Sequence, residues 1–291
     1  MFELHRVGER TYYIESPAKI GVFVDGDGAY LIDSGNDKDA GRKVRKILDE
    51  NGWRLRGIVN THSNADHIGG NGYLQRQTGC KVFSCGIERA FTEYPILEPS
   101  FLYGGFPCGE LRHKFLLAAE SEVSDFSDAD FPKELEIIPL NGHFFNMTGF
   151  RTPDDVVFLA DCLSSRETLD KYGIGFIYDV AEYLKTLETV EGMSARMFVP
   201  SHAAATDNIA ELARYNIGKV NEIADRITAL CETPRGFESI LGALFGEYGL
   251  KMTFEQYVLV GSTVRSYLAW LHDLGRLAVD FEDNMMLWKR A

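Results

Sequence analysis

The sequence predicts an α/β fold with a separate helical region at its C-terminal end. β-rich runs alternate with helical patterns through about the first 205 residues, an order typical of helices that cover a sheet. Beyond His202 the pattern is helical and closes with two short β-rich runs. With 291 residues the chain suits one large domain or two, since a domain averages ~150 residues. We therefore expect a layered domain over residues 1–206 and a module over residues 207–291.

The first half of the layered domain is predicted to begin with several strands joined by turns. Gly26-Asp27-Gly28 lies between two β-rich runs, which favours a hairpin. Apolar residues spaced three and four apart then indicate an amphipathic helix, which Gly52 ends. The expected strands cover 12–15, 21–25, 29–33, 56–60 and 81–84, and the expected helices cover 38–51 and 71–78.

The alternation breaks down between residues 92 and 127, where we expect a long irregular segment. This segment contains prolines and a Gly-Gly pair, and its aromatic residues include Tyr94, Phe101, Tyr103, Phe106 and Phe115. So much aromatic content is unlike disorder, and long irregular loops in compact domains are usually functional. We weigh an apolar wall or lid over a site against a packed insertion or a subunit contact, and the last alternative would imply a homodimer.

The remaining elements are predicted to deliver polar residues at strand ends and then to become helical. Strands are expected over 134–140, 156–160 and 196–199, with helices over 179–191, 207–230, 236–249 and 254–274, and a terminal hairpin over 277–281 and 285–289. Helices closed by a hairpin suggest a winged-helix-like module. We expect this module on the rim of the site, because its apolar faces need a partner.

The segment His62-Ser63-Asn64-Ala65-Asp66-His67 follows a predicted strand and precedes Gly69-Gly70. Imidazole nitrogens and carboxylate oxygens are ligands that borderline divalent cations prefer. The alternative is that these polar residues only cap a helix and fill a turn. Further polar residues follow three other predicted strands, namely His143, Asp161 and His202. Four strand ends therefore favour a metal centre, which needs ligands held rigidly by several elements.

These segments resemble the metallo-β-lactamase superfamily, whose metal-binding motif is His-x-His-x-Asp-His. Asn64 stands where the second histidine of that motif is expected. The resemblance extends to about residue 205 through Asp33-Ser34-Gly35, Gly142-His143, Phe158-Leu159-Ala160-Asp161 and Pro200-Ser201-His202. It implies an αββα sandwich. The helical module resembles the C-terminal module of the lactamase-β-2-like hydrolases, although by pattern and not by motif.

The resemblance implies a dinuclear centre, with zinc as the expected metal. His62 and His143 would hold one ion, Asp66, His67 and His202 the other, and Asp161 would bridge them. Asn64 is either a weak ligand or a lost one, so the first ion is expected to be weakly held or to be a harder cation such as manganese or iron. Asp33 is expected to support a ligand histidine by a hydrogen bond.

The activity that the resemblance implies is hydrolysis of a small acyl substrate, such as a thioester, lactone or other ester, by a metal-bound hydroxide. Coordination lowers the pKa of water toward ~7, and Asp66 would be the catalytic residue that orients the nucleophile. Two alternatives stay open: a phosphodiesterase or nuclease of the same fold, and a non-catalytic metal-binding protein.

Composition favours a small-molecule substrate over other partners. With 43 acidic and 30 basic residues the formal charge is -13, which repels nucleic-acid phosphates. No apolar run approaches the ~20 residues of a membrane span, and the first residues lack the pattern of an export signal, so we expect a cytoplasmic protein without membrane association. The five cysteines include no Cys-x-x-Cys pair, so they predict neither a disulfide framework nor a zinc ribbon.

Overall fold

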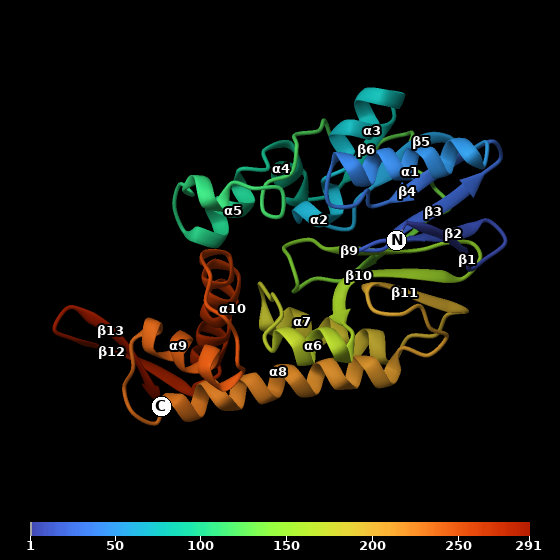
Figure 1. Ribbon diagram of the computed structural model, residues 1–291. Coiled ribbons are helices and arrows are strands. Elements are labelled where there is room, and N and C mark those ends of the chain that lie inside the picture. Colours follow the sequence, from blue (N-terminus) through green and yellow to red (C-terminus); the bar gives the residue numbers. More distant parts are fainter. Residues whose placement is uncertain (1) are drawn as a thin grey trace.

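The computed structural model describes residues 2–291, and it shows two sheets packed face to face with helices on the outer side of each (Figure 1). A seven-stranded sheet has the order β1-β2-β3-β4-β5-β6-β7, and a four-stranded sheet has the order β11-β10-β9-β8. Strands β4, β5, β6 and β7 run parallel to one another, as do β10 and β11. The predicted αββα sandwich is therefore confirmed.

The seven-stranded sheet follows the predicted order of strands and helices. Its strands are β1 (Glu3–Arg6), β2 (Thr11–Glu15), β3 (Ile20–Asp25), β4 (Gly28–Ile32), β5 (Arg54–Val59), β6 (Lys81–Ser84) and β7 (Ser124–Asp125). The helices between them are α1 (Lys38–Glu50), α2 (Ala65–Ile68), α3 (Asn71–Thr78), α4 (Glu88–Glu93) and α5 (Leu97–Tyr103), with a 3-10 turn at Gly109–Leu111. Helix α1 begins at Asp37, whose side chain accepts a hydrogen bond from the Ala40 amide.

The four-stranded sheet and the C-terminal region complete the chain. The strands are β8 (Glu136–Pro139), β9 (Thr148–Arg151), β10 (Val156–Ser164) and β11 (Met197–His202), and the helices are α6 (Arg166–Tyr172), α7 (Val180–Glu191), α8 (Ala210–Leu230), α9 (Phe237–Glu247) and α10 (Phe254–Asp273). A hairpin of β12 (Leu277–Glu282) and β13 (Met285–Arg290) closes the chain. No helix within residues 2–291 is long and apolar enough to cross a bilayer.

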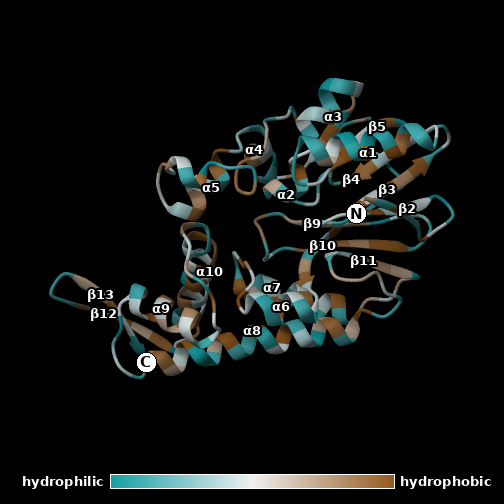
Figure 2. Cartoon of the chain, viewed as in Figure 1, coloured by the Kyte–Doolittle hydropathy of each residue, from teal (hydrophilic) through white to brown (hydrophobic). Residues whose placement is uncertain are grey.

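Three buried clusters hold the layers together. One lies between the seven-stranded sheet and α1, and it includes Leu31, Val44 and Ile58. A second lies between the two sheets, where Phe23, Phe83, Phe150 and Phe158 are buried. The third joins the four-stranded sheet to α7, α8 and α10 through residues such as Leu159, Leu187, Ile223 and Leu268. Figure 2 shows the corresponding hydropathy, with largely hydrophobic strands and a hydrophilic outer side on α1.

The C-terminal region packs onto the sandwich through one face of α8. Buried residues recur along this helix every three or four positions, at Ala213, Asn216, Val220, Ile223, Ala224 and Ile227. The predicted order of three helices and a hairpin is present. Side chains before and after residue 206 share a single buried cluster, so the domain boundary and the winged-helix comparison remain predictions.

The expectation of an irregular segment over 92–127 was wrong where α5 forms. Pro99 lies in the first turn of this helix, where the missing backbone donor breaks no hydrogen bond within the helix. Gly104 adopts a left-handed conformation and ends the helix. Proline and glycine usually indicate a loop, but here they occupy the first turn and the C-terminal end of a short helix, where both residues are tolerated.

Candidate metal centre

The predicted metal-binding residues come together at one edge of the two sheets. They are His62 after β5, Asp66 and His67 on α2, His143 between β8 and β9, Asp161 in β10 and His202 at the end of β11. They form two groups, each with one potential ligand atom per residue and all of these atoms within 4.8 Å of one another. The first group is His62, His143 and Asp161; the second group is Asp66, His67, Asp161 and His202.

A buried hydrogen-bond chain fixes the tautomer of His62. The Thr61 hydroxyl donates its only proton to Asp33 Oδ2 at 2.7 Å, since a carboxylate oxygen accepts. The same hydroxyl lies 3.0 Å from His62 Nδ1, so it must accept a proton from that nitrogen. His62 Nε2 is left with a lone pair, the form in which imidazole binds a metal.

The same reasoning applies to His67 and His202. His67 Nδ1 lies 2.8 Å from Asp33 Oδ2, so the hydrogen bond that was predicted from Asp33 to a candidate ligand histidine is present. His202 Nδ1 lies 3.0 Å from the carbonyl oxygen of Pro17, which can only accept. Both rings therefore carry a proton on Nδ1 and present Nε2 toward Asp161, at 3.1 Å in each case.

The donor atoms in the middle of the centre are buried and unpaired in a way that suits a cation. Among residues 2–291, His62 Nε2, His67 Nε2 and Asp161 Oδ1 are buried and have no hydrogen-bond partner. His67 Nε2 and Asp161 Oδ1 lie 3.1 Å apart, but both are acceptors when the ring proton is on Nδ1. Buried polar atoms in proteins are nearly always paired, so three such atoms converging on one space call for a ligand. Nitrogen and carboxylate donors fit a transition-metal ion such as zinc.

The histidine pKa values differ between the two groups. Burial lowers the pKa of His62 well below its usual value and also lowers the pKa of His143. Burial lowers the pKa of His67 and His202 as well, but carboxylates led by Asp161 outweigh it. They raise the pKa of His67 well above its usual value and that of His202 to about 10. The negative field that favours a second proton on these rings would also favour a bound cation, more strongly in the second group.

Backbone conformation aims two of these side chains. Ala160, directly before Asp161, has φ 49, and the pairing of β10 with β11 is irregular on both sides of it. Gly142, directly before His143, has φ 113, and a Cβ atom there would lie 2.2 Å from the Tyr183 nitrogen. Only glycine fits this position against α7, so the loop after it can turn His143 toward Asp161.

Asn64 lies at the first group with its side-chain oxygen facing His143. The distance from Asn64 Oδ1 to His143 Nε2 is 3.3 Å, and Asn64 Nδ2 donates to Glu98 Oε1 at 2.8 Å. The carboxylate of Glu98 thereby orients the amide, because the nitrogen faces away from His143 and the oxygen toward it. Its role as a ligand stays a prediction.

Two buried glutamates around the motif were missed by the sequence analysis. Glu98, on α5, also accepts from the Ala65 amide at 3.1 Å. Glu88, on α4, accepts from the Ser63 amide at 3.0 Å and from the Asn146 amide at 2.8 Å. Burial raises the pKa of Glu98 well above its usual value and that of Glu88 to about 7. No spacing in the sequence links either residue to the motif.

An aromatic cluster adjoins the first group. Phe144 lies 6.3 Å from His62 and Phe176 lies 5.4 Å from His143, measured between ring centroids. Phe101 of the aromatic segment packs 6.1 Å from Phe144. Tyr103 packs instead on Phe254 of α10, at 5.9 Å. The segment therefore contributes Phe101 to the surroundings of the centre and Tyr103 to the contact with the C-terminal region.

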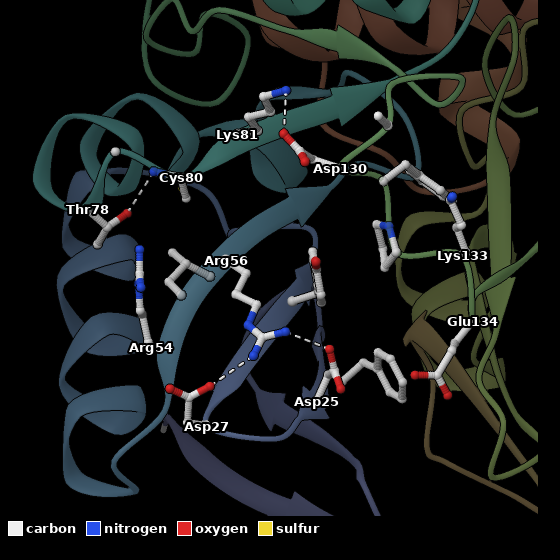
Figure 3. A pocket seen from close by; sticks show the side chains of 17 residues that line it. Asp25, Asp27, Arg54, Arg56, Thr78, Cys80, Lys81, Asp130, Lys133 and Glu134 are labelled. Carbon is white, nitrogen blue, oxygen red and sulfur yellow. Dashed lines mark hydrogen bonds and ion pairs between the residues drawn. The ribbon is translucent and has the colours of Figure 1, made fainter.

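A large surface hollow lies elsewhere, at the starts of β5 and β6 (Figure 3). Its volume is about 760 Å³, and its lining includes none of the candidate metal-binding residues. The metal centre lies at the opposite ends of the same strands, since His62 follows the end of β5. The charges that line the hollow are largely paired with one another, for example Arg56 with Asp25 and Asp27, and Lys81 with Asp130 (Figure 3).

The fold and the two ligand groups together define an αββα protein with a potential dinuclear metal centre. A family profile described as "Metallo-beta-lactamase superfamily" matches residues 15–202, more than half of the chain. The chain belongs to the metallo-beta-lactamase superfamily, as the motifs predicted.

Known proteins of this superfamily resemble the chain over different lengths. A protein of Rhodobacter capsulatus named hydroxyacylglutathione hydrolase is 26% identical over 192 residues, which are 64% of either chain. The matches span less than two thirds of the length of the curated relatives. The predicted class of hydrolase agrees with the names of these relatives.

Solved structures extend the likeness to the C-terminal region. A beta-lactamase domain protein from Burkholderia ambifaria has a TM-score of 0.74 at 15% identity, over 99% of this chain and 95% of its own. A metallo-beta-lactamase family protein from Thermus thermophilus has a TM-score of 0.68 at 14% identity, over 100% and 98%. At these identities the likeness concerns the fold alone, and it includes the helices and hairpin after residue 206.

Proposed function

We propose that this protein is a dinuclear metal-dependent hydrolase that acts on a small thioester or related ester. The observation that carries the proposal is the pair of adjoining ligand groups that share Asp161. Each group adds ring nitrogens to this shared carboxylate, and three of the four rings lie in networks that leave Nε2 free. Bound cations would make water a nucleophile near neutral pH and polarise the acyl carbonyl.

Asp66 is suited to the role of orienting the attacking water. Its side chain is 35% exposed, whereas the side chain of Asp161 is 10% exposed. Asp66 Oδ2 lies 3.5 Å from His202 Nε2 and 3.7 Å from His67 Nε2. Although burial opposes the effect, these two rings lower the pKa of Asp66 below its usual value, so the group stays ionised and can accept a hydrogen bond from the attacking water.

The remaining residues position the ligands and limit access of water. Asp33 holds Thr61 and His67 at the same time, which couples the two groups through one buried carboxylate. Phe144 and Phe176 cover the side of the first group with apolar rings. Low local polarity strengthens the interaction of the fixed charges with a reacting carbonyl.

The thioester class draws support from the name of the relatives, hydroxyacylglutathione hydrolase, and from the charge of the chain. A formal charge of -13 disfavours a polyanionic substrate such as nucleic acid. This excess of acidic residues is compatible with a small substrate that reaches a locally cationic, metal-loaded centre.

The test is metal analysis of gently purified protein, followed by assays with thioesters, lactones, β-lactams and phosphodiesters. We expect up to two transition-metal ions per chain and the highest kcat/KM with a thioester or other ester. Activity with phosphodiesters alone would favour the alternative function, a phosphodiesterase or nuclease of the same fold. Failure to retain or rebind any transition metal would contradict the proposal.

A further inference from the structure

Helix α10 presents one of its faces to a surface groove beside α5. The groove has a volume of about 800 Å³ and is lined by α10, the C-terminal end of α5 and the first turn of α7. The N-terminal end of α10 packs against α5, where Tyr103 contacts Phe254, so the two helices form adjacent walls (Figure 1). The groove-facing residues of α10 recur every three or four positions; they are Ser262, Arg265, Ser266, Ala269, Trp270 and Asp273.

This face of α10 is suited to close contact with another helix. Ser262, Ser266 and Ala269 have small side chains, and Ala269 is exposed. Small side chains let two helices approach to about 8 Å between their axes. Aromatic residues, which are enriched in protein–protein interfaces, also line the groove, namely Phe101, Tyr103, Tyr178 and Trp270. The groove therefore combines a flat helix face with aromatic walls.

Two charged residues on this face have no partner of opposite charge. Within residues 2–291, neither Arg265 nor Asp273 takes part in a salt bridge, whereas the nearby Arg276 is paired. The exposed Arg265 lies over the Phe237 ring and beside the Tyr257 hydroxyl, neither of which is charged. Asp273 is the last residue of α10, where a negative charge is unfavourable because the carbonyl end of a helix is itself negative. A cation from outside the chain would remove this cost.

The two charges are placed symmetrically about Ala269. Arg265 precedes Ala269 by four residues and Asp273 follows it by four, so all three share one face of α10 within about 12 Å along its axis. In two antiparallel copies of α10 related by a two-fold axis at Ala269, each Arg265 faces Asp273 of the partner subunit. Such a contact is isologous, and it forms two salt bridges from one pair of residues.

We propose that a second copy of this chain docks along this face, so that the protein is a two-fold symmetric dimer whose antiparallel α10 helices cross at Ala269. A stable interface buries about 800 Å² on each partner, and the walls formed by α5 and α7 add to the area that α10 supplies. The aromatic segment would then take part in a subunit contact. A formal charge of -13 on each chain opposes association at long range, whereas the two reciprocal pairs bring opposite charges together where the copies meet.

Reversal of either charge tests the pairing between copies. Arg265→Glu would place two carboxylates opposite each other at both contacts, and Asp273→Arg would place two guanidinium groups there. We expect sedimentation equilibrium to show a dimer for the wild-type protein. In each variant the dissociation constant of the dimer should rise by about a hundredfold or more, because like charges in contact are strongly unfavourable. Asp273→Arg improves the charge at the end of α10, so this variant should unfold at no lower temperature than wild type.

An equimolar mixture of the two variants separates a lost contact from a lost fold. In a mixed dimer, the new glutamate of one chain faces the new arginine of the other, and the unchanged Asp273 faces the unchanged Arg265. We expect the mixture to form a one-to-one dimer with a dissociation constant within about tenfold of the wild-type value, although each variant alone is monomeric. A mixture that fails to associate would overturn the proposal.

Two further variants locate the interface. Ala269→Glu changes an exposed residue, so the fold should be kept, but the new carboxylate would meet its own copy at the two-fold axis and prevent association. Lys46→Glu, on α1, is the control, because Lys46 is 76% exposed and lies outside the groove. This variant should remain a dimer. A dimer that survives Ala269→Glu would overturn the proposal, and so would a monomeric wild-type protein, which would leave the groove to a helix of another protein.

Discussion

The two groups of the metal centre share Asp161 but differ in what surrounds their histidines. In the second group, Asp66 adds another carboxylate, and the pKa of His202 is raised to about 10. In the first group, an amide oxygen, that of Asn64, lies beside the two rings and Asp161, and burial lowers the pKa of His62 and His143. The second group therefore surrounds its site with two carboxylates, whereas the first group has only the shared carboxylate of Asp161 and attracts a cation less strongly.

This difference shows that a ligand set cannot be judged from ring nitrogens alone. Both groups contain two histidines, and a cation is stabilised further by the negative charge around it. The amide of Asn64 would supply an oxygen without that charge, and its orientation depends on Glu98. We therefore expect the two ions to bind with unequal affinities. Substitution of a single residue in or around either group should change this difference in affinity.

The largest effect is expected from Asp161→Asn, because Asp161 belongs to both groups. We expect both ions to bind more weakly, the metal content to fall below one per chain after gel filtration, and kcat/KM to fall by about a thousandfold or more. Inductively coupled plasma analysis and the ester assay measure the two effects.

Asp130→Asn is the control for that variant. Asp130 pairs with Lys81 in the hollow of Figure 3, away from the centre. It should keep full metal content and activity. Loss of only one ion in Asp161→Asn would show that the carboxylate serves a single group and would contradict the assignment of Asp161 to both groups.

Asn64→His is expected to remove most of the difference in metal affinity between the two groups. An imidazole at this position could donate Nδ1–H to Glu98, as the amide does now, and direct Nε2 toward the first ion. We expect the affinity of the first group to rise by about tenfold or more, with the second group unchanged.

Chelator titration followed by site-resolved occupancy in crystals measures this change. In the wild-type protein the first group should lose its ion at a lower chelator concentration than the second group. Equal loss from both groups in the wild-type protein, or no gain in Asn64→His, would mean that residue 64 does not contact the ion.

The sequence predicts the fold and the ligands better than it predicts their surroundings. Alternating apolar residues and the glycine-rich turns define most strands, and the polar residues at their ends are local to each strand. The residues that orient the centre are remote, since Glu98 lies 34 positions from Asn64. A carboxylate in a short, proline-containing helix carries no sequence signal for burial, because burial is decided by the packing of α5 on the rest of the fold.

Short elements were the other limit of the sequence analysis. α2 has four residues and β9 has four, too few to show a helical or alternating period. The irregular conformation at Ala160, which aims Asp161, is equally invisible in an apolar run.

Glu98→Gln should weaken the first group moderately. Glu98 accepts hydrogen bonds from Asn64 and from the Ala65 amide on its two oxygens, whereas glutamine has only one acceptor oxygen. One donor loses its partner, and the Asn64 amide is no longer held with its oxygen toward His143. We expect the affinity of the first ion to fall by about threefold to tenfold, with the second ion unaffected.

The exposed Glu110 of the neighbouring 3-10 turn provides the control, as Glu110→Gln makes the same substitution without touching the motif. Cobalt titration followed by visible absorption distinguishes the two sites. An equal fall in both affinities would indicate that Glu98 supports the loop in general and does not orient Asn64.

The smallest effect on metal binding is expected at Glu88, which holds Ser63 and Asn146 and so supports the loop that serves both groups, and its main effect is on stability. Burial raises its pKa to about 7 in the folded protein, whereas a glutamate in the unfolded chain has a pKa of about 4.3. Between these values the folded state binds more protons, so the stability that Glu88 contributes is full below the lower value and is lost as pH rises through the upper one.

Glu88→Gln removes this titration, and the comparison with wild type isolates it. From about pH 5.5 to about pH 8.5, the unfolding free energy of wild type minus that of the variant should fall by about 2 kcal/mol. Urea unfolding of chelator-treated protein measures the difference without a contribution from metal binding. A difference that stays constant with pH would mean that the donors around Glu88 keep it ionised throughout, and that burial does not govern this carboxylate as it governs the neutral histidines of the first group.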